Sequence, residues 1–108
     1  MYRGRILAKG EDLIETQEVT INGKKTIGLK VDLQGAPLLL LVAQKGYIMC
    51  GYLNIDTAER LGQAAAVVTG VKSFGDVLNA KVARLTTHAK RLGIKEGMLG
   101  REALRRMS

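Results

Sequence analysis

Residues 38–54 read Leu38-Leu-Leu-Leu-Val-Ala-Gln-Lys-Gly-Tyr-Ile-Met-Cys-Gly-Tyr-Leu-Asn54. Two apolar runs flank the dipeptide Lys45-Gly46, and each has the length of a β-strand rather than of a membrane span. Glycine at the second turn position supplies the positive φ that a tight hairpin turn requires. Neither run alternates with polar residues, so both faces of the two strands should be covered by other parts of the chain. The stretch therefore predicts a hairpin at the centre of a sheet.

The composition is that of one small globular domain. A chain of 108 residues buries about two thirds of its unfolded surface, which is enough for a single core. No apolar run approaches the roughly 18 residues of a transmembrane helix, and the N-terminus lacks the continuous apolar stretch of a secretory signal. The single cysteine, Cys50, excludes an intrachain disulfide and is consistent with a reducing compartment. We therefore expect a cytoplasmic protein that does not associate with membranes.

The net charge of +7 is concentrated at the C-terminal end. Residues 81–108 contain eight lysines and arginines against Glu96 and Glu102, so they carry six of the seven net positive charges. A basic end of this kind can bind nucleic acid or an acidic protein surface through phosphate or carboxylate contacts. No aromatic or glycine-rich recognition pattern accompanies the charge, which favours a solvated helix face instead. Both interpretations stay open at the level of the sequence.

The N-terminal part predicts an extension followed by a hairpin. Residues 1–16 show no clear period and are predicted to be an N-terminal extension, while residues 17–108 form a single domain. Residues 18–33 contain Asn22-Gly23, a strong hairpin signal, ahead of a strand in which apolar and polar residues alternate. One face of this hairpin is therefore predicted to face solvent. Residues 34–37, which end in proline, are predicted to end the alternating strand. The apolar members of the alternating strand are Ile27, Leu29, Val31 and Leu33.

Beyond the central hairpin the pattern changes to short helices alternating with strands. Asn54 or Asp56 is the predicted N-cap of the first helix, and Ser73 that of the second. Strand-helix-strand units require parallel neighbours joined by right-handed crossovers. The predicted fold class is α+β, with a mixed sheet of about six strands built from two N-terminal hairpins and then strand-helix-strand units, and with short helices packed on it. The predicted elements are a helix over 54–62, a strand over 64–68, a helix over 73–79, a strand over 81–85, and helices over 88–92 and 101–107.

Three long motifs, over residues 45–54, 62–82 and 92–104, resemble the YunC-like family of small bacterial and archaeal proteins. The resemblance covers about residues 17–104, and the motifs follow in the family's order. It implies a compact α+β fold and a domain of unknown function, without a chemistry. One departure is Leu99, at a position where the family pattern leads us to expect a threonine that caps the last helix above Glu102. Without that hydroxyl the capping box is incomplete.

A ligand site is predicted where the strands of the parallel part end. Helix N-termini and loop N–H groups converge outside the carboxyl ends of parallel strands, which makes that crevice the usual binding site. A small anionic ligand suits the hydrogen-bonding groups there and the charge of Lys72. The alternative is a turn glycine beside a capping serine, since residues 69–73 match no phosphate-binding loop of known spacing. The predicted ligand-binding residues are Asn54, Asp56, Thr69, Gly70, Lys72, Ser73, Thr86, Thr87 and His88.

Cys50 and His88 are the candidate catalytic residues. A regular strand through Asn54 would align Cys50 with Tyr52 and Asn54 on one face. A nucleophilic cysteine needs a base or a positive field nearby. His88 can supply one only if the predicted strand over 81–85 lies next to the strand that contains Cys50. A mid-strand cysteine is otherwise a small hydrophobic residue of the core. One histidine, one cysteine and scattered carboxylates offer no spaced ligand pair, so no metal site is predicted, and no cofactor is identified.

Three functions follow from these features as hypotheses. The first is a domain that binds a small, anionic molecule or regulates through it, and that self-associates. The second is an enzyme that uses Cys50 or His88. The third is a protein that binds nucleic acid or an acidic partner through its basic C-terminal quarter. A homodimer is favoured over a monomer, because short helices leave one face of an apolar sheet in need of cover.

Overall fold

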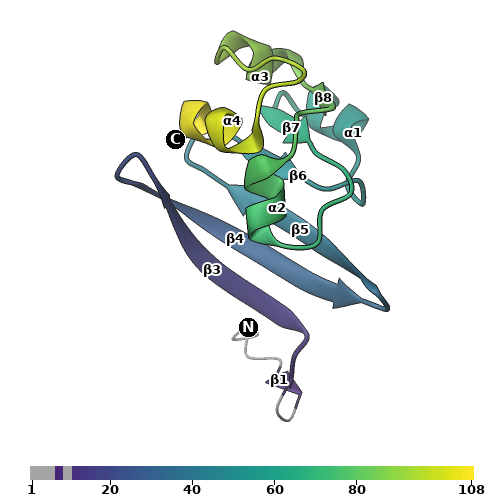
Figure 1. Ribbon diagram of the computed structural model, residues 1–108. Helices are drawn as coiled ribbons and strands as arrows, with labels where there is room; N and C mark the ends of the chain where they lie inside the picture. Colours follow the sequence, from purple (N-terminus) through teal and green to yellow (C-terminus); the bar gives the residue numbers. More distant parts are fainter. Residues whose placement is uncertain (1–6, 9–10) are drawn as a thin grey trace.

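Strands β3 to β8 form one six-stranded mixed sheet with helices on both sides (Figure 1). The structure is a computed structural model, and it describes residues 7–8 and 11–108. The strands follow the order β3-β4-β5-β6-β7-β8 across the sheet, and β1 pairs with β2 in a separate two-stranded ribbon. This arrangement confirms the predicted α+β class. The strands are β1 (Leu7–Ala8), β2 (Glu11–Asp12), β3 (Ile14–Ile21), β4 (Lys24–Leu33), β5 (Ala36–Val42), β6 (Tyr47–Met49), β7 (Ala65–Val67) and β8 (Arg84–Leu85).

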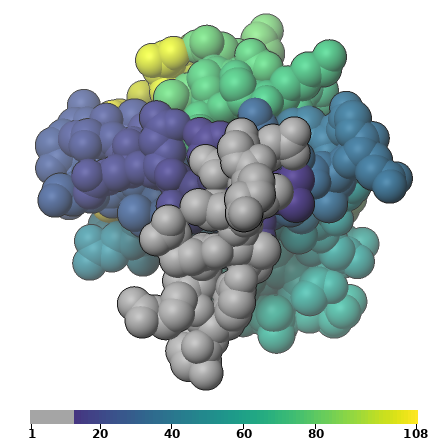
Figure 2. Space-filling model, turned by 90° about the horizontal axis from the view of Figure 1, so that it is seen from below, coloured from purple at the N-terminus to yellow at the C-terminus, as the bar shows by residue number. Residues whose placement is uncertain are grey.

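Four short helices complete the fold, and they lie in two layers. Helices α2, α3 and α4 cover one face of the sheet, and α1 covers β6 and β7 from the other face. Figure 2 shows this layering, with β3 to β5 as a purple and blue band between green and yellow helical residues and the teal residues around α1. The helices are α1 (Ile55–Arg60), α2 (Phe74–Asn79), α3 (Thr87–Arg91) and α4 (Gly100–Met107).

The first long strand begins earlier than the sequence indicated. β3 starts at Ile14, whereas the hairpin was predicted from residue 18. The turn between β3 and β4 falls at the predicted Asn22-Gly23, and both residues adopt positive φ. The predicted N-terminal extension over residues 1–16 lies partly outside the described residues.

The predicted central hairpin is confirmed, but its turn differs in detail. β5 and β6 pair antiparallel with Leu41 opposite Ile48, and the Ala43 N–H donates to the Gly46 carbonyl at 2.8 Å. The expected positive φ at Gly46 is wrong, since this residue lies outside the left-handed region. Glycine is needed there for a different reason, because a Cβ would lie 2.6 Å from the carbonyl oxygen of Ala64.

Strand β6 is shorter than predicted. It ends at Met49, and residues 50–53 form a turn in which the Leu53 N–H donates to the Cys50 carbonyl at 3.3 Å. Asn54 then caps α1, since its Oδ1 accepts from the Asp56 N–H at 2.8 Å. The expectation of a strand regular through Asn54 is therefore wrong, because the turn and the cap take over its second half.

The predicted parallel crossover through α1 is confirmed, and the prediction of a second parallel crossover through α2 is wrong. β6 and β7 pair in parallel, as the first strand-helix-strand unit requires. β8 instead runs antiparallel to β7, with Arg84 opposite Val67. Helix α2 packs on α4 and β5 rather than along β7 and β8, so the chain returns to the sheet from the same end at which it left. This reversal separates residues that the sequence analysis had placed together.

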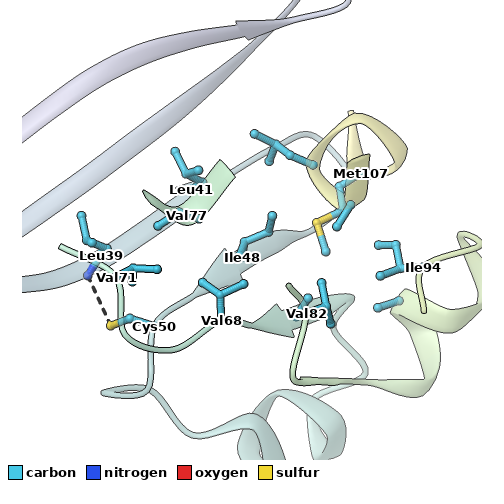
Figure 3. Close-up of a cluster of buried hydrophobic side chains, with 14 of the residues drawn as sticks. Leu39, Leu41, Ile48, Cys50, Val68, Val71, Val77, Val82, Ile94 and Met107 are labelled. Carbon is cyan, nitrogen blue, oxygen red and sulfur yellow. Dashed lines mark hydrogen bonds between the residues drawn. The ribbon is translucent and has the colours of Figure 1, made fainter. Parts of the chain in front are cut away.

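The core lies between the sheet and the layer of α2, α3 and α4. Leu39 and Leu41 of β5 and Ile48 of β6 point into it, where they meet residues of the helices (Figure 3). Helix α4 contributes an apolar stripe whose three members are fully buried. That stripe consists of Ala103, Leu104 and Met107.

The alternation in β4 places its small and polar residues, not its large apolar ones, toward the helices. Thr26 is only 1% exposed, and its hydroxyl donates to the Val19 carbonyl at 2.7 Å. Gly28 lies under the ring of Phe74, where a Cβ would approach Cε1 to 2.7 Å. Ile27 points to the opposite face and is 49% exposed. One face of the hairpin thus faces solvent, and that face is the apolar one.

Helix α4 starts in close contact with α2. Leu99 occupies the N-cap position and makes no side-chain cap hydrogen bond, which confirms the incomplete capping box. At Gly100 a Cβ would lie 2.0 Å from the carbonyl oxygen of Val77. Because that oxygen belongs to the backbone of a packed helix, only glycine allows the two helices to approach this closely.

The substitution Gly100→Ala should therefore destabilise the protein by about 3 kcal/mol, since the added methyl group forces α4 away from α2. Gly75→Ala is the matched control, because Gly75 lies within α2 with only Ser73 Oγ within 4 Å of its Cβ position, at 3.8 Å. That variant should gain up to about 1 kcal/mol from helix propensity. Chemical denaturation of both variants measures the difference, and equal stabilities would contradict the close contact.

Candidate functional site

The antiparallel β8 divides the predicted ligand-binding residues into two groups. The first group follows β6 and β7 at their carboxyl ends, and the second follows β8 at the opposite end of the sheet. The expectation of one shared rim is therefore wrong for the second group. The first group contains Asn54, Asp56, Thr69, Gly70, Lys72 and Ser73, and the second contains Thr86, Thr87 and His88.

Thr86 and Thr87 of the second group stabilise the start of α3. Thr86 is 1% exposed, and its hydroxyl donates to the Gln63 carbonyl at 2.7 Å while it accepts from the N–H groups of Ala65 and Ala89. The Thr87 N–H donates to Oε1 of Glu59 at 2.8 Å, and this hydrogen bond lowers the pKa of the Glu59 carboxyl. These bonds fasten the start of α3 to β7 and to α1.

Thr86→Val should therefore lower stability by about 3 kcal/mol, because two backbone N–H groups lose their buried acceptor. Thr87→Val is the control, since the Thr87 side chain is exposed and the change should stay within about 0.5 kcal/mol. Thermal and urea unfolding measure both variants. A Thr86→Val protein as stable as its control would show that the hydroxyl has no structural role.

Three side chains of the first group already have partners. Asn54 caps α1, and the Ser73 hydroxyl caps α2 by accepting from the Asp76 N–H at 3.1 Å. Asp56 lies 3.2 Å from the guanidinium of Arg84. Lys72 forms no ion pair within the described part of the chain, and its side chain is exposed. Lys72 therefore provides the available positive charge in this group.

A pocket of about 410 Å³ lies beside Lys72. It is bounded by the turn between β4 and β5 on one side and by the segments that follow β6 and β7 on the other. Its volume falls in the range of roughly 300–1,000 Å³ that is common for small-molecule sites. The lining residues are Gly35, Ala36, Pro37, Cys50, Gly51, Tyr52, Gly70, Val71 and Lys72.

Tyr52 stands at the centre of this end of the molecule. It is 52% exposed, and it borders the main pocket and two neighbouring hollows of about 390 and 460 Å³. One hollow includes Asn54 and Arg84, and the other includes Leu33. An exposed aromatic ring among three hollows offers a planar apolar surface against which a ligand can stack.

Part of this pocket could not be predicted from the sequence. Residues 35–37 read only as the end of a strand, and Tyr52 was placed within a regular strand. Strand pairing brings these residues together. Because β5 pairs with β6, the turn between β4 and β5 lies beside the end of β6. The signal available in the sequence was a pair of glycines, Gly35 just before β5 and Gly51 just after β6, which the pairing brings to the same end of the two strands.

Cys50 lies at the base of the pocket and belongs to the core. It is 4% exposed, and its Sγ accepts the Leu39 N–H at 3.3 Å (Figure 3). The condition for a thiol–imidazole pair is not met, because β8 neighbours β7 and not β6. His88 follows β8 at the far end of the sheet. The structure thus separates the two candidate catalytic residues.

Because Cys50 is packed and hydrogen-bonded, its modification by a bulky thiol reagent at neutral pH should be at least ~100-fold slower in the folded protein than in denaturant. Stopped-flow or timed absorbance measurements with a chromogenic disulfide give both rates. Fast and complete labelling of the folded protein would instead support an activated thiol. Cys50→Ala provides the blank, since it removes the single thiol of the chain.

The arginines of the basic C-terminal quarter contact side chains of the protein itself. Arg105 and Arg106 both contact the carboxylate of Glu102, the second through Nε at 3.3 Å. The Arg105 hydrogen bond lowers the pKa of Glu102. Arg101 donates to the side-chain oxygen of Asn79. These contacts favour the interpretation of a solvated helix face.

Two further structural facts bear on the class of protein. Within the described ranges, no helix combines the length and apolar character that crossing a membrane requires. Among the described residues, no three side chains of histidine, cysteine, aspartate or glutamate gather into a group that could hold a metal ion.

The sheet and its helices define a small α+β domain whose parallel pair ends at a pocket. The sequence profile of a domain of unknown function (DUF1805) matches residues 49–107, and the chain belongs to this family. It is 31% identical over 99 residues to the uncharacterized protein YunC of Bacillus subtilis (strain 168), covering 88% of this chain and 98% of that protein. This relationship confirms the family resemblance of the three motifs.

A solved structure shares the fold. It is the crystal structure of a protein of unknown function, TA1206, from Thermoplasma acidophilum. The two chains are 38% identical and superpose with a TM-score of 0.84, and the match covers 88% of this chain and 93% of that one. The described architecture is therefore that of a known crystal structure.

Proposed function

We infer that this protein is a small-molecule-binding or regulatory domain that self-associates, and that the pocket beside Tyr52 takes a small anionic ligand. The observation that carries this inference is the position of Lys72. Lys72 lines a pocket of about 410 Å³, and within the described part of the chain it forms no ion pair. A cation without an ion-pair partner in the lining of a largely apolar pocket suits a ligand that brings a negative charge.

The backbone of the pocket supports the same inference. A Cβ built on Gly51 or Gly70 meets no atom within 4 Å, so both glycines leave their backbone open on that side. A ligand can therefore approach the main chain at the carboxyl ends of β6 and β7, which are the parallel strands of the sheet. At Gly51 neither a positive φ nor a packing contact requires glycine.

The walls of the pocket indicate what kind of anion fits. Pro37 and Val71 contribute apolar surface, and Tyr52 contributes an exposed ring. Lys72 is the charged residue among the lining residues. The arrangement favours a small carboxylate or phosphate compound with a planar or apolar body, which stacks on Tyr52 while its charge meets Lys72.

A thermal-shift panel of carboxylates and phosphates tests this proposal. A ligand present at about 100 times its Kd stabilises the folded state by about 2.7 kcal/mol, which raises the Tm by several degrees. Lys72→Ala should weaken binding by about 10- to 100-fold, since a charge-assisted hydrogen bond is worth about 1.5–3 kcal/mol.

Lys95→Ala is the matched control, because it removes the same charge from a different surface, near Leu85 and Ile94. It should leave the thermal shift unchanged. Two results would contradict the proposal: an absence of stabilisation across the panel, or a stabilisation that Lys72→Ala and Lys95→Ala reduce equally.

A further inference from the structure

Two cavities at the ends of β6 and β7 lie on opposite faces of the sheet. The pocket of about 410 Å³ is lined by Cys50 and Val71, which belong to the core under α2, α3 and α4 (Figure 3). The neighbouring hollow of about 390 Å³ is lined by Ile55 and Val67, which belong to the cluster under α1. Successive residues of a strand point to alternate faces, so the carboxyl ends of these two strands have a cavity on each side.

Gly51 and Tyr52 line both cavities, so the two cavities meet at these residues. A Cβ built on Gly51 meets no atom within 4 Å, and the φ of this residue lies outside the left-handed region that favours glycine. The missing side chain therefore leaves the main chain open between the cavities. The ring of Tyr52, which is 52% exposed, stands beside this opening. A ligand can extend from one cavity to the other over Gly51 with its body against the ring.

Each cavity has one charged side chain among its lining residues, and both of these side chains are positive. Lys72 lines the pocket. Arg84 of β8 lines the hollow, where the strand register places it opposite Val67. Two cations on either side of a shared aromatic residue suit a ligand that carries two separate negative charges.

Arg84 keeps hydrogen-bond donors for a ligand although it already has a partner. Its guanidinium donates to the carboxylate of Asp56 at 3.2 Å, and both side chains are largely exposed. A guanidinium carries several N–H donors, and this hydrogen bond uses one of them. Because an exposed ion pair is weak, the contact with Asp56 orients Arg84 at the hollow without satisfying it.

The third hollow beside Tyr52 has the opposite charge. Its lining residues are Asp32, Leu33, Gln34 and Tyr52, so its charged group is a carboxylate. An acidic group of a ligand is repelled from this side of the ring. The charges around Tyr52 therefore direct an anionic ligand along the line from Lys72 to Arg84.

We propose that the ligand carries two acidic groups, each a carboxylate or a phosphate, on opposite sides of one planar body. One acidic group binds Lys72 and the other binds Arg84, while the body crosses Gly51 against the ring of Tyr52. This proposal rests on the proposed function of the pocket and narrows its ligand class, because a ligand with one acidic group fills only one of the two cationic cavities.

Two matched pairs of aromatic probes test the proposal by isothermal titration calorimetry on the full chain. Phenylacetate and phenyl phosphate carry one acidic group, and 1,3-phenylenediacetate and 3-(carboxymethyl)phenyl phosphate carry a second one on the same ring. In the wild type the second acidic group should tighten binding by about 10-fold, since it gains a charge-assisted hydrogen bond from Arg84. Arg84→Gln should remove this gain and leave the binding of the one-acid probes unchanged.

Arg91→Gln is the matched control for that variant. It makes the same change in α3, at the opposite end of the sheet, and should keep the gain from the second acidic group. Equal affinities for one-acid and two-acid probes in the wild type would overturn the two-ended ligand, and so would a gain that persists in Arg84→Gln.

Gly51→Ala tests the passage between the cavities. Its methyl group meets no atom of the folded protein, so the variant should fold, which circular dichroism checks. The methyl group occupies the space that the ligand body crosses, so the two-acid probes should bind about 10-fold more weakly and the one-acid probes as before. Gly75→Ala, which lines neither cavity, should bind every probe like the wild type. Two-acid probes that bind Gly51→Ala as tightly as the wild type would overturn the passage over Gly51.

The failure of this proposal can be told apart from the failure of the proposed function. A ligand of the carboxylate and phosphate panel that needs Lys72 but is indifferent to Arg84→Gln would overturn the two-ended ligand and leave the anion-binding pocket in place. An absence of binding by all of these probes and by the whole panel would overturn both.

Discussion

The parallel pairing of β6 with β7 is the constraint on which the structure depends. Strands that run in the same direction cannot be joined by a tight turn, so residues 50–64 must cross one face of the sheet. Helix α1 is that crossover, and it covers β6 and β7 on the side that α2 and α4 do not reach. The pocket arises at the carboxyl ends of this pair, where the chain leaves the sheet twice, after Met49 and after Val67.

Much of this architecture could be predicted from the sequence, because the sequence patterns that mark its turns and helix caps are local. Asn22-Gly23 formed the predicted turn, Asn54 and Ser73 capped the predicted helices, and residues 38–49 formed the predicted hairpin, although Val42 is 41% exposed. Each of these features depends on residues within a few positions of one another, so propensity and periodicity are enough to find them.

The predictions that failed depend on distant contacts. The direction of β8 follows from the packing of α2 on α4 and β5, which brings the chain back from the end at which it left. No local pattern in residues 81–85 records that packing. The same reversal moved His88 away from Lys72 and left Cys50 without a base, so the predicted rim was divided. The contribution of residues 35–37 to the pocket was missed for the same reason, because strand pairing and not sequence proximity brings them beside Tyr52.

Phe74 is held against the backbone of β4 at Gly28, where even a methyl group would overlap its ring. This contact fixes the start of α2 relative to β4, and with it Val71 and Lys72, which precede the helix by only a few residues. The opposing wall, residues 35–37, is the turn that ends the same β4. Both walls of the pocket are thus anchored to β4, one through the contact of Phe74 with Gly28 and the other through the turn that follows the strand. For the ligand of the proposed function, a pocket whose two walls are both anchored to one strand is preorganised, so little binding free energy is lost to closing it.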